Sequence, residues 1–81
     1  QRLHSDATQG QDRYKNLFLT EKERDVLTWV AKGKSNSVIA DLLNISDFTV
    51  NFHLRKIYRK LQVNDRIVAT TKAITLGLIH P

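Results

Sequence analysis

The apolar residues of the chain recur with a helical period, and no segment shows the sustained alternation that is typical of a strand. The first apolar stripe consists of Leu27, Val30 and Ala31, with Val26 beside them. Thr20 followed by Glu23 is a capping-box pattern, in which each side chain satisfies a backbone N–H of the first turn. Gly33 supplies a left-handed stop after the stripe. We therefore predict a first helix over residues 21–32.

Two further amphipathic segments follow in close succession. The apolar stripe of the first consists of Val38, Ile39, Leu42 and Leu43. Ser35 or Asn36 can cap its start, and Asn44 is predicted to end it because Asn tolerates left-handed backbone. The next segment has Ser46 as its N-cap and is predicted to form a helix over residues 47–62. Its buried face consists of Val50, Leu54, Ile57, Tyr58 and Leu61.

A fourth helical segment completes the pattern. Asn64 or Asp65 can cap it, Gly77 ends it, and its apolar stripe consists of Ala69, Ala73 and Leu76. We predict an all-α fold over residues 17–81, a four-helix bundle that contains a helix-turn-helix. Residues 1–16 hold too few large apolar side chains to be buried, so we expect a linker or a disordered N-terminal segment there.

The link between the second and third predicted helices carries the main structural signal. Only residues 44–46 separate the two helices, and such a short link forces a sharp turn. Ala40 is small where the helices approach each other, and Ile45 is placed to pack against Val50 as a hydrophobic staple. These features favour a helix-turn-helix, although an ordinary αα-hairpin shares some of them.

The charge of the chain points to a polyanionic partner. Lys and Arg number 13 against 8 Asp and Glu, which gives a net charge of +5. On the predicted third helix, the residues opposite the buried face are Phe52, Arg55, Lys56 and Arg59, flanked by Thr49 and Asn51, with Lys60 at the margin. Such a face fits the major groove of DNA, where Arg and Asn contact base edges and Lys and Arg contact phosphates. A solvated helix face is the plainer alternative.

Two more features concern the same surface. The second helix starts after Lys34 and Ser35, where free backbone N–H groups can hold a DNA phosphate. Phe52 is placed to touch a thymine methyl group in the groove. If Phe48 and Phe52 form an exposed anchor instead, the domain is a basic helical module that binds a protein. Salt dependence separates the two alternatives, because only phosphate binding weakens steeply with salt.

The residue content argues against other classes of function. The chain has no cysteine, and His4, His53 and His80 lack metal-ligand spacing, so we expect no metal. Neither a Gly-rich phosphate loop nor a nucleophile with a partner base is present, so we expect no cofactor and no enzymatic activity. No apolar run approaches the roughly 18 residues of a membrane span, so we expect no membrane partner.

A long series of residues at fixed spacing matches a known family pattern. The matching residues are Leu19, Thr20, Glu23, Arg24, Val26, Leu27, Ala31, Gly33, Lys34, Ser35, Ile39, Ala40, Ile45, Ser46, Thr49, Val50, His53, Ile57, Lys60, Leu61, Val63, Arg66, Ala69, Ala73, Gly77 and Leu78. With them the chain resembles the LuxR-type helix-turn-helix domain over roughly residues 17–80. Val38, where Glu is frequent, and Asn44, where Gly is frequent, depart from the pattern.

The resemblance implies a bacterial, cytoplasmic domain that binds double-stranded DNA as a homodimer and regulates transcription. Such domains are usually the C-terminal output of a longer protein with an upstream sensing domain, and the first residue, Gln1, fits that expectation. The resemblance also admits RNA polymerase as a partner. The stretch from Thr49 to His53 is most similar to the quorum-sensing branch that responds to acyl-homoserine lactones, whereas response regulators more often have Lys at the position of Asn51.

Site residues follow from the resemblance position by position. The implied base contacts are Asn51, Phe52 and Arg55. The implied phosphate contacts are Lys34, Thr49, Lys56, Arg59 and Lys60, to which the helix start adds Ser35. The implied dimer contacts, along the fourth helix, are Val68, Thr71, Lys72 and Thr75.

Overall fold

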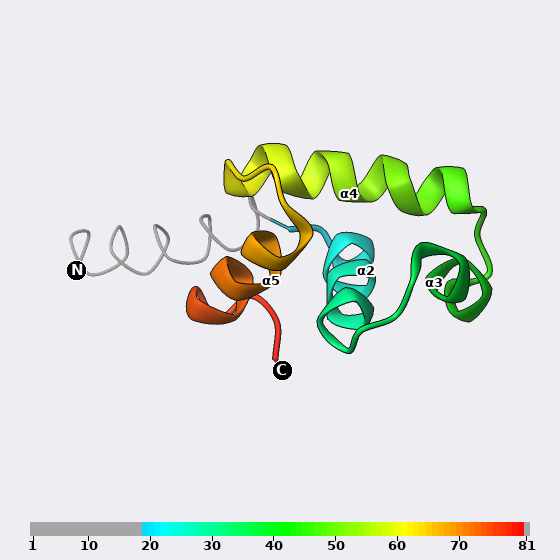
Figure 1. Ribbon diagram of the computed structural model, residues 1–81, viewed down its shortest axis with the longest axis horizontal. Coiled ribbons are helices and arrows are strands. Elements are labelled where there is room, and N and C mark those ends of the chain that lie inside the picture. Colours follow the sequence, from blue (N-terminus) through cyan, green and yellow to red (C-terminus); the bar gives the residue numbers. More distant parts are fainter. Residues whose placement is uncertain (1–18, 81) are drawn as a thin grey trace, which may run out of the picture.

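The computed structural model describes residues 19–80, and this part of the chain is helical throughout apart from short links (Figure 1). Its helices are α2 (Glu21–Ala31), α3 (Asn36–Leu43), α4 (Asp47–Leu61) and α5 (Arg66–Thr75). The long helix α4 runs along one side of the molecule and spans α2, α3 and α5 (Figure 1). The predicted all-α fold is confirmed. The linker expected over residues 1–16 lies outside the described residues.

Each helix begins with a side chain that accepts a hydrogen bond from the first turn. The capping box of α2 is formed as predicted, with the Thr20 N–H donating to Glu23 Oε1 over 2.9 Å and the Glu23 N–H donating to Thr20 Oγ1 over 3.1 Å. Ser35, not Asn36, caps α3, and Ser46 caps α4. Asp65, not Asn64, caps α5, and its carboxylate accepts two backbone N–H groups. Local sequence therefore determines where the helices start.

The helix ends confirm most of the predicted stops. Gly33, Asn44 and Gly77 have φ values of 84°, 60° and 75°, in the left-handed region. Gln62 also adopts this conformation, with φ 59°, and ends α4 one residue earlier than predicted. The link to α5 explains this position: the Val63 N–H donates to the Tyr58 carbonyl over 2.9 Å, which closes the last turn.

A single core lies beneath α4. This helix contributes Val50, Leu54, Ile57 and Leu61, none of which is more than 2% exposed. The other core residues are Leu19, Val26, Leu27, Val30, Ile39, Ala40, Ala69, Ala73, Leu78 and Ile79. Because one face of α4 is fully buried, the opposite face of α4 is turned to solvent. Among the described residues, no helix combines the length and the apolar character needed to cross a bilayer.

The prediction for the buried stripe of the second helix was partly wrong. Val38 and Leu42 are 41% and 48% exposed, whereas Ile39 and Ala40 are buried. The side of α3 that carries Ile39 and Ala40 therefore faces the core. Helical periodicity places the four predicted apolar residues on one broad stripe, and tertiary packing selects which part of that stripe is buried.

Candidate nucleic-acid interface

The turn between α3 and α4 fixes the direction of α4 relative to α3. Asn44 takes the left-handed conformation, and the Ile45 N–H donates to the Ala40 carbonyl over 2.9 Å. Ile45 is half-buried and packs against the core. Figure 1 shows α3 and α4 joined by this tight turn at one end of the molecule. The arrangement is that of a helix-turn-helix.

The solvent-facing side of α4 holds every predicted base contact. Asn51, Phe52 and Arg55 are exposed, and so is the predicted phosphate contact Arg59. Thr49 and Lys56 are half-buried at the flanks of this face. We call the surface formed by these six residues the α4 face. It combines three cations, one amide, one hydroxyl and one aromatic ring.

The aromatic ring of the α4 face contacts two side chains of the same helix. The Lys56 ammonium lies over the Phe52 ring, 5.2 Å from its centroid. The His53 ring packs edge-on against Phe52, with a centroid distance of 5.8 Å and an interplanar angle of 62°. The sequence holds a signal for the first contact, because residues four apart in a helix are neighbours. The sequence interpretation nevertheless treated Phe52 and Lys56 as independent.

His53 lies half-buried beside the α4 face. Within the described part of the chain, its buried Nδ1 atom has no hydrogen-bond partner. Burial lowers the pKa of His53, although the nearby carboxylate of Glu23 acts in the opposite direction. The imidazole therefore favours its neutral form at the inner margin of the α4 face.

Lys60 occupies a different environment from the one predicted. Its ammonium donates to Glu23 Oε1 over 2.6 Å, and only 25% of the Lys60 side chain is exposed. The Glu23 side chain is 1% exposed. Burial pushes the pKa of Glu23 upward, but the hydrogen bonds from Lys60 and from the Thr20 N–H outweigh it and lower the pKa below its usual value. Lys60 therefore joins α4 to α2 through its ammonium.

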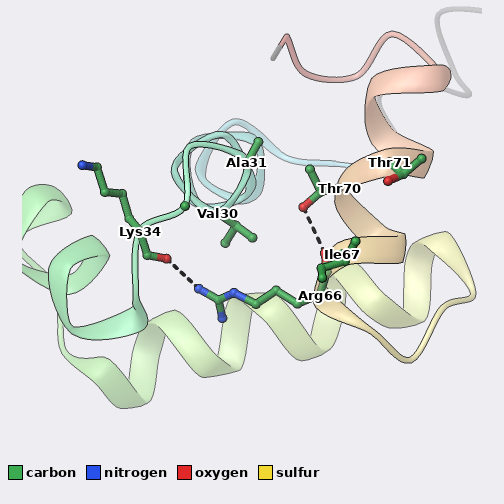
Figure 2. A pocket seen from close by; sticks show the side chains of 8 residues that line it. Val30, Ala31, Lys34, Arg66, Ile67, Thr70 and Thr71 are labelled. Atoms are coloured by element: carbon green, nitrogen blue, oxygen red, sulfur yellow. Dashed lines mark hydrogen bonds between the residues drawn. The ribbon is translucent and has the colours of Figure 1, made fainter.

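Arg66 organises the start of α3, a role that the sequence interpretation missed. Its guanidinium donates to Asn36 Oδ1 over 2.7 Å and to the Lys34 carbonyl over 2.8 Å. Figure 2 shows this side chain reaching from α5 to the backbone of Lys34, while the Lys34 ammonium points away from it. The Ser35 hydroxyl accepts the Val38 N–H over 3.3 Å as a helix cap. The Arg66 guanidinium therefore holds the backbone segment that carries Lys34 and Ser35.

Beside this segment lies a depression of about 350 Å³ between the end of α2 and the start of α5 (Figure 2). Its walls include Val30 and Ala31 from α2 and Ile67 and Thr70 from α5.

Within residues 19–80 there is no cluster of three or more His, Cys, Asp or Glu side chains that is able to hold a metal ion.

The predicted dimer contacts fall into two groups. Val68 is 50% exposed, and Thr71 and Thr75 are also exposed on the same side of α5. The Lys72 ammonium instead donates to the carbonyl of Leu61, the last residue of α4, over 2.8 Å. Ile67, which the sequence interpretation did not include, is 75% exposed. We call Ile67, Val68, Thr71 and Thr75 the α5 face.

Comparison with known proteins shows to which family the chain belongs. The model of the luxR family of bacterial regulatory proteins, GerE, matches residues 17–73. The chain belongs to this family. The match confirms the resemblance drawn from the residue pattern, and it covers α2, α3, α4 and most of α5.

Individual family members show the same relationship. The chain is 44% identical over 64 residues to the transcriptional activator protein AnoR of Acinetobacter nosocomialis, a match that covers 79% of this chain and 27% of AnoR. It is 44% identical over 63 residues to the quorum-sensing regulator RhlR of Pseudomonas aeruginosa, covering 78% and 26% of the two chains. It is 54% identical over 52 residues to the nitrate/nitrite response regulator NarP of Escherichia coli, covering 64% and 24%.

The chain corresponds to only one part of each of these relatives. The chain spans about a quarter of the length of the relatives it matches. Quorum-sensing regulators and a response regulator both occur among them. The helix-turn-helix is therefore common to proteins with different signals.

Proposed function

We propose that this domain binds double-stranded DNA in a sequence-specific manner and is the DNA-binding part of a transcriptional regulator. The observation that carries the proposal is the α4 face, which presents cations and hydrogen-bonding groups to solvent while the opposite side of the helix is fully buried. An α-helix with its side chains is about 10–12 Å in diameter, and the major groove, about 12 Å wide, admits one.

The residues of the α4 face divide between bases and phosphates. Asn51, Phe52 and Arg55 lie in the first half of the helix and face outward, where an inserted helix contacts base edges. Thr49, Lys56 and Arg59 flank them and are assigned to phosphates. Lys60 is left out of this set because its ammonium is engaged by Glu23.

The start of α3 supplies a second phosphate site. Lys34 and Ser35 directly precede the helix, whose first backbone N–H groups carry a partial positive charge. Arg66 holds the backbone of this segment in place. In a helix-turn-helix the first helix crosses the DNA backbone, so phosphate contacts at this end orient α4 in the groove.

A salt titration tests the proposal. A duplex selected by this chain from a pool of random sequence is labelled, and its dissociation constant is measured by fluorescence anisotropy at several salt concentrations. Contacts from Lys34, Lys56 and Arg59 predict that log K falls with log salt with a slope of at least about 2.7 per bound copy. Arg24→Ala on α2 is the matched control, because it removes an exposed positive charge outside the α4 face.

The competing function is protein binding through aromatic residues. Phe48 is 78% exposed and Phe52 is 51% exposed, four residues apart on α4. If they anchor a protein partner, duplex affinity is weak at every salt concentration and the slope is close to zero. That result would overturn the proposal of DNA binding.

A second copy of the chain is the proposed partner of the α5 face. The α5 face is uncharged and partly apolar, and symmetric dimers are the commonest homo-oligomers of soluble proteins. One short helix face buries little area, so we expect a weak dimer for the isolated chain. A sensing domain elsewhere in the whole protein and contact with RNA polymerase stay predictions of the family resemblance.

A further inference from the structure

The Phe52 ring is an apolar group on an otherwise polar helix face, and it contacts two side chains of its own helix. The ring is half-exposed, at 51%. The Lys56 ammonium lies 5.2 Å from its centroid, and the His53 ring packs against its edge. These contacts come from the same helix, so they are independent of any DNA or second copy of the chain.

An aromatic ring that already contacts neighbouring side chains suits a particular kind of contact. Restricting a side chain before binding reduces the entropy lost on association. Asn51 and Arg55, beside Phe52, are polar and exposed, and they suit the donors and acceptors of base edges. The ring suits an apolar group instead. In the major groove that group is the C5 methyl of thymine, and cytosine has only a hydrogen at this position.

We infer that Phe52, positioned by Lys56 and His53, recognises the C5 methyl group of a pyrimidine at one position of the bound DNA site. Thymine carries this methyl group, and 5-methylcytosine carries it at the same ring atom. The domain therefore distinguishes thymine from uracil, and 5-methylcytosine from cytosine, at that position. This inference depends on the proposed binding of α4 in the major groove.

Lys56 is a positioning residue in this arrangement as well as a candidate phosphate contact. The two roles have different signatures. Loss of a phosphate contact weakens binding to every duplex by the same factor. Loss of the cation over the ring allows Phe52 to move, which changes the ratio of affinities for thymine and uracil duplexes. Arginine also stacks on aromatic rings, so Lys56→Arg keeps both roles.

The experiment uses the complete 81-residue chain and a duplex that it selects from a random pool. Each thymine is replaced in turn by deoxyuridine, which removes one methyl group and leaves the base-pairing edge unchanged. We expect about fourfold weaker binding at one thymine position, or at its symmetric pair, as for the burial of one methyl-sized group. At the same position, 5-methylcytosine is expected to bind better than cytosine by a similar factor.

Three variants complete the test. Phe52→Ala is expected to bind thymine and deoxyuridine duplexes equally, and Lys56→Gln to lower the ratio as well as the overall affinity. Lys56→Arg is expected to keep the ratio of the wild-type chain. Because Phe52 and Lys56 lie outside the core, all three variants are expected to fold, which thermal unfolding verifies.

The outcomes separate the inference from the proposed function. A wild-type chain that is insensitive to deoxyuridine at every position would overturn the methyl contact, and so would a Phe52→Ala variant that keeps the wild-type ratio. Sequence-specific binding in either experiment would leave the proposed function intact. A chain that binds no duplex even at low salt would overturn both.

Discussion

The α4 face and the α5 face are exposed surfaces of helices that pack on the same core, yet their chemistry differs. The α4 face carries Arg55, Lys56 and Arg59 around an aromatic ring. The α5 face carries Ile67, Val68 and two threonines, and it has no charged member. Two nearby cations, Lys60 and Lys72, are turned into the fold by hydrogen bonds to Glu23 and to the Leu61 carbonyl.

This difference shows that net charge alone does not define a binding surface. The fold uses some of its cations to join helices and leaves others in solvent. A polyanion is the partner that suits the α4 face, whereas a second apolar surface suits the α5 face.

The orientation of α4 decides which residues reach solvent, and Ile57 is the residue that tests it. Its side chain is fully buried, so Ile57→Ala is expected to lower the free energy of unfolding by about 2–5 kcal/mol. Urea denaturation measures the change. Arg59→Ala, on the exposed side, is the control and is expected to stay within about 0.5 kcal/mol of wild type. Equal stability of the Ile57 variant and the control would show that α4 is rotated differently.

The pairing of Glu23 with Lys60 tests whether Lys60 belongs to the fold. Glu23→Gln keeps a side chain suited to the capping box and removes the charge, which leaves Lys60 half-buried without its partner. We expect a loss of about 2–4 kcal/mol in the free energy of unfolding at pH 7. Duplex affinity of the folded protein is expected to change little. Unchanged stability of Glu23→Gln would show that Glu23 does not hold Lys60 and would return Lys60 to the DNA-contacting set.

The same carboxylate predicts a pH dependence with a definite sign. The pKa of Glu23 is lower in the folded chain than its ordinary value of 4.5, despite the desolvation that opposes this, because Lys60 and the Thr20 N–H bind the charged form and Lys56 adds to it. Its stabilising contribution is therefore complete above pH 4.5 and is lost as the pH falls through the lower folded-state pKa. Urea denaturation from pH 7 to pH 3 should show a steeper decline for wild type than for Glu23→Gln.

Arg55 tests the base-contacting part of the α4 face. It is exposed at the centre of that face, so Arg55→Ala is expected to weaken binding of the selected duplex by about 1–3 kcal/mol. The preference at one base pair should be lost at the same time. Competition assays with duplexes changed at single positions measure both effects. Equal weakening on selected and random duplexes would make Arg55 a phosphate contact.

Self-association of the chain is expected to depend on the α5 face. Ile67→Lys places a charge at the most exposed apolar residue of α5, where it is expected to weaken self-association of the chain by about 1 kcal/mol. Sedimentation equilibrium at high protein concentration measures the change. Leu42→Lys on α3, which is 48% exposed, is the matched control and is expected to associate like wild type. The opposite ranking would place the dimer contact on α3.

The residues that define the fold act over short distances in the sequence, which is why the fold was predictable. The capping box at Thr20, the caps at Ser46 and Asp65, and the left-handed turn at Asn44 each depend on neighbours within a few positions. The amphipathic pattern of α4 then indicated its exposed side. The base-contacting and phosphate-contacting roles of that side stay predictions.

What the sequence interpretation missed depends on contacts between distant residues. Glu23 and Lys60 are 37 positions apart, and Arg66 is 32 positions from the carbonyl it binds. Nothing in a linear pattern brings such partners together. The exposure of Leu42 was missed for the same reason, because neighbouring helices decide how α3 is rotated.

The guanidinium of Arg66 has a mechanical consequence. It belongs to the helix that carries the α5 face, and it binds both the backbone before α3 and a side chain in the first turn of α3. Hydrogen bonds from this one side chain therefore join the beginnings of α3 and α5. The α5 face and the proposed phosphate site at Lys34 and Ser35 are therefore linked through a single side chain.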